Sequence, residues 1–137
     1  MRRLLVTLAA GVTLAAGAPL ALAACEPPAG YPLRADSPRY AVFFRTDPAA
    51  LDVGKYFSVD VFACAKQGDD APAGLKVDAQ MPAHRHGMNS RATVVQSAPG
   101  RFRARGLMFH MPGVWQFMFD VQGAHGAERA TGEFDLK

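Results

Sequence analysis

In the stretch "VWQFMFDV", Val114 to Val121, large apolar side chains at every second position alternate with Gln116, Met118 and Asp120. Successive side chains of a strand point to opposite sides, so Trp115, Phe117, Phe119 and Val121 share one face. The side chains between them, including Met118, share the other face, which we expect to be exposed. A face this rich in aromatic carbon is stabilised by removal from water. The stretch therefore predicts a β-strand whose aromatic face lies in the core of the domain.

The chain around this strand has the same character. "YFSVDVFACA", Tyr56 to Ala65, also alternates, and we expect Phe57, Val59 and Val61 to face the core. No segment shows a sustained helical period. Turn residues such as Pro112-Gly113 separate the apolar runs. We expect strands at 40–46, 56–65, 75–81, 91–96, 101–111, 114–121 and 127–137. The pattern predicts an all-β fold, an antiparallel Ig-like β-sandwich of about seven strands.

The alternation breaks once, in the segment that begins at Arg101. Phe102 and Ala104 indicate one inward parity, whereas Leu107 and Phe109 indicate the opposite one. Gly106 lies between the two pairs, and a β-bulge there would shift the register by one residue. A bulge at this position predicts that Met108 and His110 point away from the core.

The first residues have the form of a bacterial secretory signal. Arg2 and Arg3 precede an uncharged run, Leu4 to Ala24, that ends in small residues. We therefore divide the chain into a signal peptide at 1–24, an irregular Pro-rich arm at 25–39 and the sandwich at 40–137. Loss of the two arginines lowers the formal net charge from +3 to +1. This balance gives little reason to expect a nucleic-acid partner.

The two cysteines allow two interpretations. An even count in an exported, oxidising compartment favours a Cys25–Cys64 disulfide. The run Leu22 to Cys25 also fits a lipobox, the signature of a bacterial lipoprotein. Lipidation would occupy the thiol of Cys25 and anchor the protein to a membrane. The expected location is the periplasm, with a lipid anchor at Cys25 as the alternative.

Two short strips concentrate histidine and methionine. They are "MPAHRHGM", Met81 to Met88, and "LMFHMPGVW", Leu107 to Trp115. Thioethers favour Cu(I), and imidazole accepts Cu(I) or Cu(II). Both strips lack the carboxylates that calcium and magnesium require, although methionine is also a common core residue. The sequence predicts a copper site, with Cu(I) favoured, from His84, His86, His110, Met88, Met108, Met81 and Met111.

Together, "DAQMPAHRHGMN" and "GRFRARGLMFHMPGVWQFMFDV" resemble the YtkA-like group of exported β-sandwich domains. That group shares its Ig-like architecture with periplasmic copper-binding proteins of the CopC kind. The resemblance covers roughly residues 57–121 and implies a copper-linked function carried by the two strips. The CopC kind uses an N-terminal histidine as a Cu(II) ligand, whereas this chain has Cys25-Glu26-Pro27 at the expected mature start.

Two functions from different classes remain open on the sequence. The leading hypothesis is a periplasmic or cell-envelope protein that holds copper or transfers it to an envelope partner. The alternative is a metal-free Ig-like interaction module that acts in envelope or cytochrome oxidase assembly. An enzyme is not expected, because the chain has no nucleophile elbow, phosphate-binding loop or paired carboxylates in a catalytic context.

Overall fold

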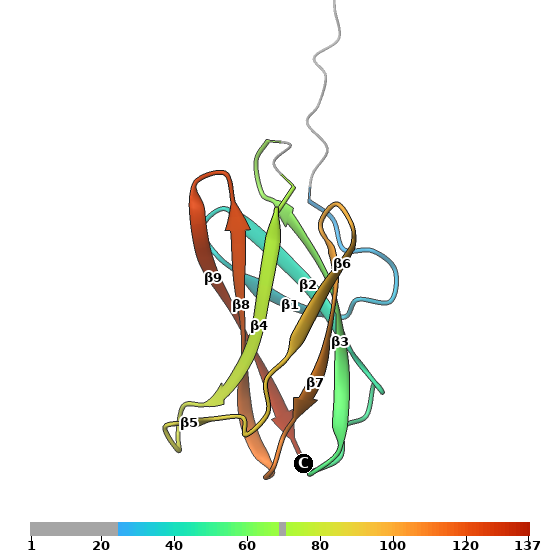
Figure 1. The fold of residues 1–137 in the computed structure, drawn as a ribbon, viewed down its shortest axis with the longest axis vertical. Helices are drawn as coiled ribbons and strands as arrows, with labels where there is room; N and C mark the ends of the chain where they lie inside the picture. The colour runs from blue at the N-terminus through green and yellow to red at the C-terminus, as the bar shows by residue number, and fades with distance from the viewer. Residues whose placement is uncertain (1–24, 69–70) are drawn as a thin grey trace, which may run out of the picture.

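The computed structural model describes residues 25–68 and 71–137, and the expected signal peptide lies outside them. Within these two ranges the chain forms nine β-strands (Figure 1). They are β1 (Leu33–Asp36), β2 (Tyr40–Asp47), β3 (Tyr56–Ala65), β4 (Gly74–Met81), β5 (His86–Gly87), β6 (Thr93–Ala98), β7 (Arg101–Met108), β8 (Gly113–Gly123) and β9 (Gly126–Leu136). Nowhere in the described chain is a helix long and apolar enough to cross a membrane.

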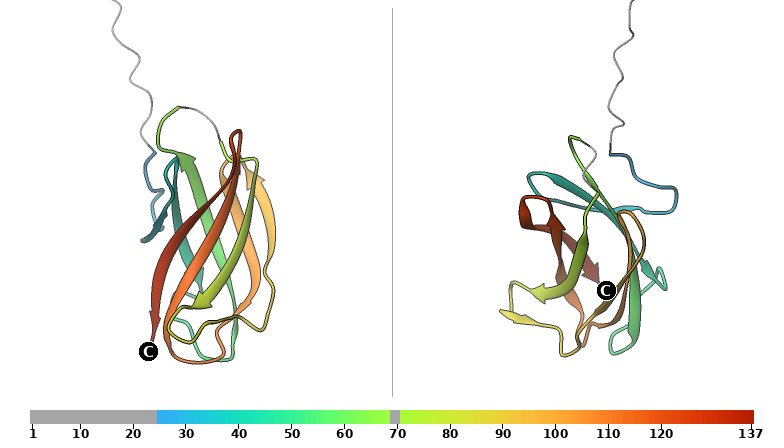
Figure 2. Two further views of the ribbon diagram at one scale, coloured as in Figure 1. Left: turned by 90° about the vertical axis from the view of Figure 1, so that its left-hand side faces the viewer. Right: turned by 45° about the horizontal axis from the view of Figure 1, so that its top comes forward.

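All nine strands are hydrogen-bonded into one antiparallel sheet, in the order β5-β4-β8-β9-β1-β2-β3-β7-β6. The predicted all-β, antiparallel class is therefore confirmed. The sheet curls strongly, so that its two halves face each other across the core (Figure 2). Strand β1 joins the halves, because it pairs along β2 and also meets β9 through Asp36 and Thr131. The sequence pattern did not indicate β1, which lies within the range expected to be an irregular arm, or the two-residue β5.

The core forms where the alternation predicted it. Trp115, Phe117, Phe119 and Val121 of β8 are all fully buried. From the facing half, Phe57 of β3 lies edge-on to Phe117, with ring centroids 6.3 Å apart. Val59 and Val61, the other expected inward residues of β3, are also buried. These side chains set the inward parity of both strands, so the predicted faces are confirmed.

The predicted bulge lies at Gly106. Phe57 pairs with Leu107 and Ser58 pairs with Arg105, so Gly106 is the extra residue of β7. Its φ of 85° lies in the left-handed region that glycine adopts without strain. The register shift turns Leu107 and Phe109 inward, and both side chains are fully buried.

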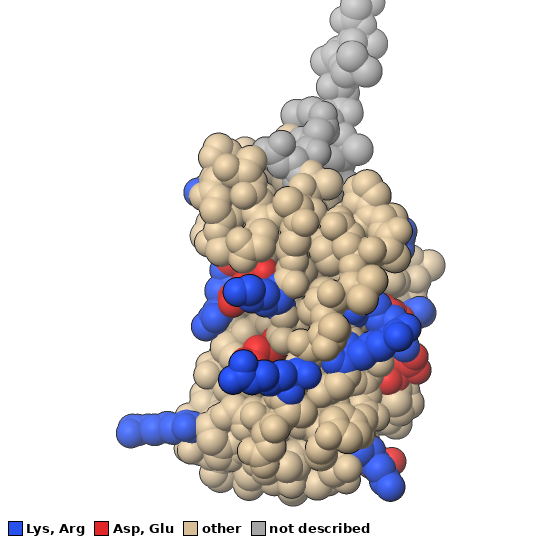
Figure 3. Space-filling model, in the orientation of Figure 1, with Lys and Arg blue, Asp and Glu red and all other residues tan. Residues whose placement is uncertain are grey.

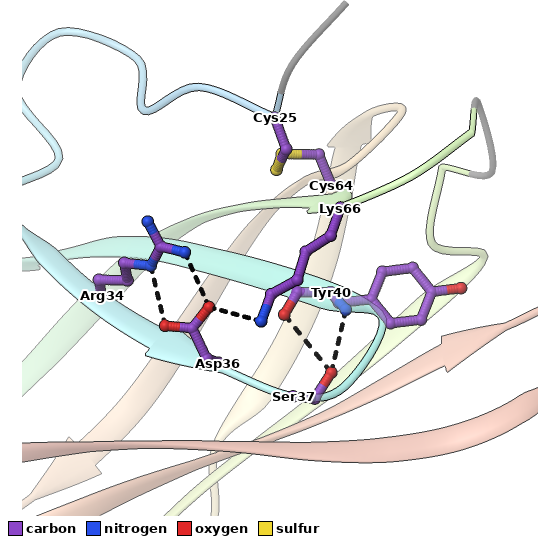
Figure 4. Close-up of a disulfide and its surroundings, with 7 residues drawn as sticks. All are labelled: Cys25, Arg34, Asp36, Ser37, Tyr40, Cys64 and Lys66. Atoms are coloured by element: carbon purple, nitrogen blue, oxygen red, sulfur yellow. Dashed lines mark hydrogen bonds and ion pairs between the residues drawn. A yellow bond between two sulfur atoms is a disulfide. The ribbon is translucent and has the colours of Figure 1, made fainter. Parts of the chain in front are cut away.

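A disulfide joins Cys25 to Cys64 of β3, with their Cα atoms 5.7 Å apart (Figure 4). The predicted pairing is therefore confirmed, and it uses the thiol that lipidation would need. Beside it, Asp36 accepts hydrogen bonds from the Arg34 guanidinium at 2.8 and 2.9 Å. Lys66 Nζ lies 2.9 Å from the same carboxylate. The Arg34 hydrogen bonds, aided by Lys66, lower the pKa of Asp36 to about 2.

Candidate functional site

The two histidine-methionine strips lie at one end of the curled sheet. The first forms the turn between β4 and β5, and the second runs from the end of β7 into β8. Figure 1 shows both connections at the end opposite the described N-terminus. The curl of the sheet therefore brings together segments that are far apart in the sequence.

Residues Pro82 to Arg85 form the turn that follows β4. The His84 N–H donates to the Met81 carbonyl at 3.1 Å, and the Arg85 N–H donates to the Pro82 carbonyl at 3.3 Å. Arg85 has a φ of 55°, a left-handed conformation that few side-chain-bearing residues adopt. The turn leaves His84 exposed, with its ring centroid 5.7 Å from that of His86.

His86 sits on β5 directly opposite Met81 of β4. Cross-strand partners project to the same side of a sheet, and Met81 is buried in the core. The Nδ1 atom of His86 lies 3.2 Å from the Gly87 carbonyl oxygen. A carbonyl oxygen only accepts, so Nδ1 carries the proton in this contact. The Nε2 lone pair of His86 is then free to bind a metal.

His110 follows β7, and its ring lies against those of His86 and Trp115. The centroid distances are 5.0 Å to His86 and 5.4 Å to Trp115. The Nδ1 atom of His110 is buried, and no described residue gives it a hydrogen-bond partner. A buried polar atom left without a partner costs about 1–3 kcal/mol. An orphaned imidazole nitrogen at this place is chemically suited to a ligand.

Trp115 closes the inner side of the site. Its ring stacks on Phe109, with centroids 4.3 Å apart, and lies 6.0 Å from the ring of His86. Its Nε1–H donates to the Met111 carbonyl at 3.0 Å. The alternation of side chains predicted that Trp115 lies in the core. It could not predict that the indole N–H of Trp115 holds the loop containing Met111 through this hydrogen bond.

The remaining methionines take different places. Met88 packs partly against the core and lines a cleft between β4 and β6. Met108 ends β7 opposite Tyr56 of β3. Met118, which parity placed on an exposed face of β8, is 9% exposed. That expectation is wrong, since the Met118 side chain is buried although it lies on the outer face of β8, where it lines a hollow of about 520 Å³.

The histidines form a row rather than a cluster around one point. Within 25–68 and 71–137, no three His, Cys, Asp or Glu side chains come together as a metal-binding group. Two methionines lie beside this row, because Met81 pairs with His86 across β4 and β5 and contacts exist among His86, Met81 and Met111. Two imidazoles with one or two thioethers suit a soft ion of low coordination number better than a hard cation.

The predicted site residues therefore divide into two groups. His86, His110, Met81 and Met111 lie together at the buried end of the row, and His84 lies at its exposed end. Met88 instead lines the cleft between β4 and β6, and Met108 lies opposite Tyr56 of β3. Comparisons of the chain with protein-family models, with curated proteins and with solved structures gave no significant match.

Proposed function

We propose that this protein is an exported copper-binding protein that holds or transfers Cu(I) at the end of its curled sheet. The observation that carries the proposal is the buried, unpartnered Nδ1 of His110 beside His86. A bound metal ion would satisfy that nitrogen, and His86 can offer Nε2 from the adjacent strand. The thioethers of Met81 and Met111 complete a soft donor set that favours Cu(I) over Cu(II).

We also infer that the curled sheet is a variant of the Ig-like sandwich of the YtkA-like and CopC kinds. Two halves of antiparallel strands enclosing one aromatic core support this assignment. The Cys25–Cys64 disulfide suits a protein of an oxidising compartment, in line with export to the periplasm. The proposal has no catalytic step, and the copper ion is cargo that an envelope partner receives or supplies.

The test is a competition titration of Cu(I) against a chelator on the mature protein. Wild type is compared with His86→Ala and His110→Ala, and His125→Ala is the control because His125 is exposed in the β8–β9 turn. We expect weaker binding in the first two variants only. Equal binding in all four proteins would show that His86 and His110 do not bind copper. A preference for Cu(II) would contradict the assigned oxidation state.

The chain contains one tryptophan, which gives a second readout. Trp115 lies 5.4 Å from the ring of His110 and 6.0 Å from the ring of His86, centroid to centroid. Copper bound between these imidazoles should quench Trp115 fluorescence and saturate at one equivalent. The His86→Ala variant should show little quenching at the same copper concentration. Quenching that continues past one equivalent would indicate surface binding instead.

A further inference from the structure

The two ends of the curled sheet do not close on each other. Strands β4 and β6 approach across a cleft of about 700 Å³ whose lining includes residues of both. Its apolar lining residues include Leu75 and Val77 of β4 and Val94 of β6, and these three are called its floor. Among the described strands, β6 pairs with β7 alone, and β5 covers the free edge of β4 only at the last two residues of β4. Two partly open strand edges therefore flank the same cleft.

The contacts of Ala79 show to which edge of β4 each backbone N–H and C=O points. The Ala79 carbonyl accepts the Met88 N–H at 3.3 Å, on the side away from β8. Its N–H is satisfied by the carboxylate of Asp78 at 2.8 Å. The N–H and C=O of alternate strand residues point to the same edge, so those of Leu75 and Val77 also face away from β8. In the described chain, neither residue has a hydrogen-bond partner on that side.

The rim of the cleft carries unmatched positive charge. Arg129 and Asp120 neutralise each other through a two-point ion pair at 2.7 and 2.9 Å. Lys76 and Arg91 also line the cleft, and neither forms an ion pair with a described residue. Figure 3 views the face on which β4 and β6 lie and shows Lys and Arg side chains across its middle, with some Asp and Glu side chains among them. Asp78 is the other carboxylate that lines the cleft, and it accepts a hydrogen bond from the Ala79 N–H.

A further polar group lies in the same lining. The Ser90 hydroxyl oxygen is buried, and it has no hydrogen-bond partner among residues 25–68 and 71–137. Ser90 directly precedes Arg91, so a hydroxyl and a guanidinium occupy adjacent positions at the cleft. A hydroxyl can donate to a carboxylate that the guanidinium also attracts. The cleft thus combines open backbone groups, an apolar floor and donors suited to an acid.

We propose that this cleft binds an extended acidic peptide segment of a partner protein as an additional strand on the open edge of β4. Backbone groups of the segment pair with Leu75 and Val77, as in other strand-addition complexes. Its inward side chains are apolar and cover the floor, and its outward side chains are acidic and meet Lys76 and Arg91. The cleft volume of about 700 Å³ suits a few residues of extended chain. The proposal stands whether or not the protein binds copper.

The probe is a blocked peptide of about seven residues, a usual strand length, in which valine and glutamate alternate. It is titrated without copper into the mature, isotope-labelled protein, and the backbone amide signals of Leu75 and Val77 are followed by NMR. We expect saturable shifts at both amides. The variant Lys76→Glu should bind roughly tenfold more weakly, because an attractive contact becomes repulsive. The control Lys55→Glu makes the same charge change outside the cleft lining and should bind like wild type.

Three altered probes make the result decisive. A peptide with lysine in place of glutamate should not bind, and one N-methylated on the residues that face β4 should lose most of its affinity. Inorganic phosphate should not reproduce the shifts at Leu75 and Val77. The proposal is overturned if the acidic peptide does not bind, or if the lysine or N-methylated peptide binds as well. Phosphate shifts equal to those of the peptide would also overturn it, because the cleft would then be a simple anion site.

Discussion

The rings of His86 and His110 lie with centroids 5.0 Å apart, although one residue belongs to β5 and the other follows β7. In the sheet order, β5 is at one end and β7 is next to the other end. The pair can meet only because the sheet curls. This proximity makes the end of the molecule a candidate copper site and links the site to the tertiary fold.

The first prediction separates the role of His110 in binding from any role in folding. The Nδ1 atom of His110 is buried and unsatisfied, so replacing the imidazole by an apolar ring of similar shape removes a desolvation cost. We expect His110→Phe to unfold in urea with a free energy within about 1 kcal/mol of wild type, or higher, while Cu(I) affinity falls. The control is His125→Phe, at an exposed position. A large loss of stability in His110→Phe would show that His110 has a structural role.

The second prediction concerns the aromatic core. Trp115 is fully buried and stacks on Phe109, so Trp115→Ala removes a large side chain from a packed interior. We expect a loss of about 3–5 kcal/mol in the free energy of unfolding. The neighbouring Val114 is 46% exposed, and Val114→Ala should change stability by about 0.5 kcal/mol or less. Similar urea midpoints for the two variants would contradict the inward face assigned to β8.

The third prediction concerns acid. The Arg34 hydrogen bonds and Lys66 lower the pKa of Asp36 from 3.8 to about 2. A lowered pKa means that the carboxylate stabilises the fold above its ordinary pKa and loses this effect as pH falls toward 2. We therefore expect wild type to be more stable than Asp36→Asn near pH 5, and the difference to shrink between pH 3.8 and about 2.

The control for this pH series is Asp52→Asn, because Asp52 forms no ion pair with a described residue. We expect the stability difference from wild type to depend on pH more strongly for Asp36→Asn than for Asp52→Asn, because only the Asp36 variant loses an ion pair. The measurement is urea unfolding at a series of pH values. A difference for Asp36→Asn that does not change with pH would show that the ion pair does not contribute to folding in solution.

The fourth prediction concerns the disulfide. Cys25 and Cys64 are separated by 39 positions in the chain, so their bond restricts a long loop in the unfolded state. The double variant Cys25→Ser with Cys64→Ser should lose roughly 2–4 kcal/mol of stability. Intact mass of the mature wild type should show no acyl group and a gain of two hydrogens on reduction. An acyl adduct on Cys25 would contradict the disulfide in the exported protein.

Much of the strand pattern could be predicted because it depends on local alternation. The inward faces of β3 and β8 follow from period two, and the bulge follows from a parity change at a glycine. The short strands β1 and β5 carry little periodic signal, because few residues alternate in them. Met118 was misplaced because parity fixes the face of a strand on which a side chain lies, whereas its exposure depends on the neighbouring residues that cover that face.

The sequence by itself determined the donors, the strand faces, the bulge and the only cysteine pair, since each depends on residue type or near neighbours. Tertiary structure alone decided which donors meet. The curl brings the β4–β5 turn to the β7–β8 connection, so that His86 and His110 come together, while Met88 turns toward the cleft beside β4. Long-range pairing through β1 and β9 shapes that curl, and no local sequence period encodes a contact between distant strands.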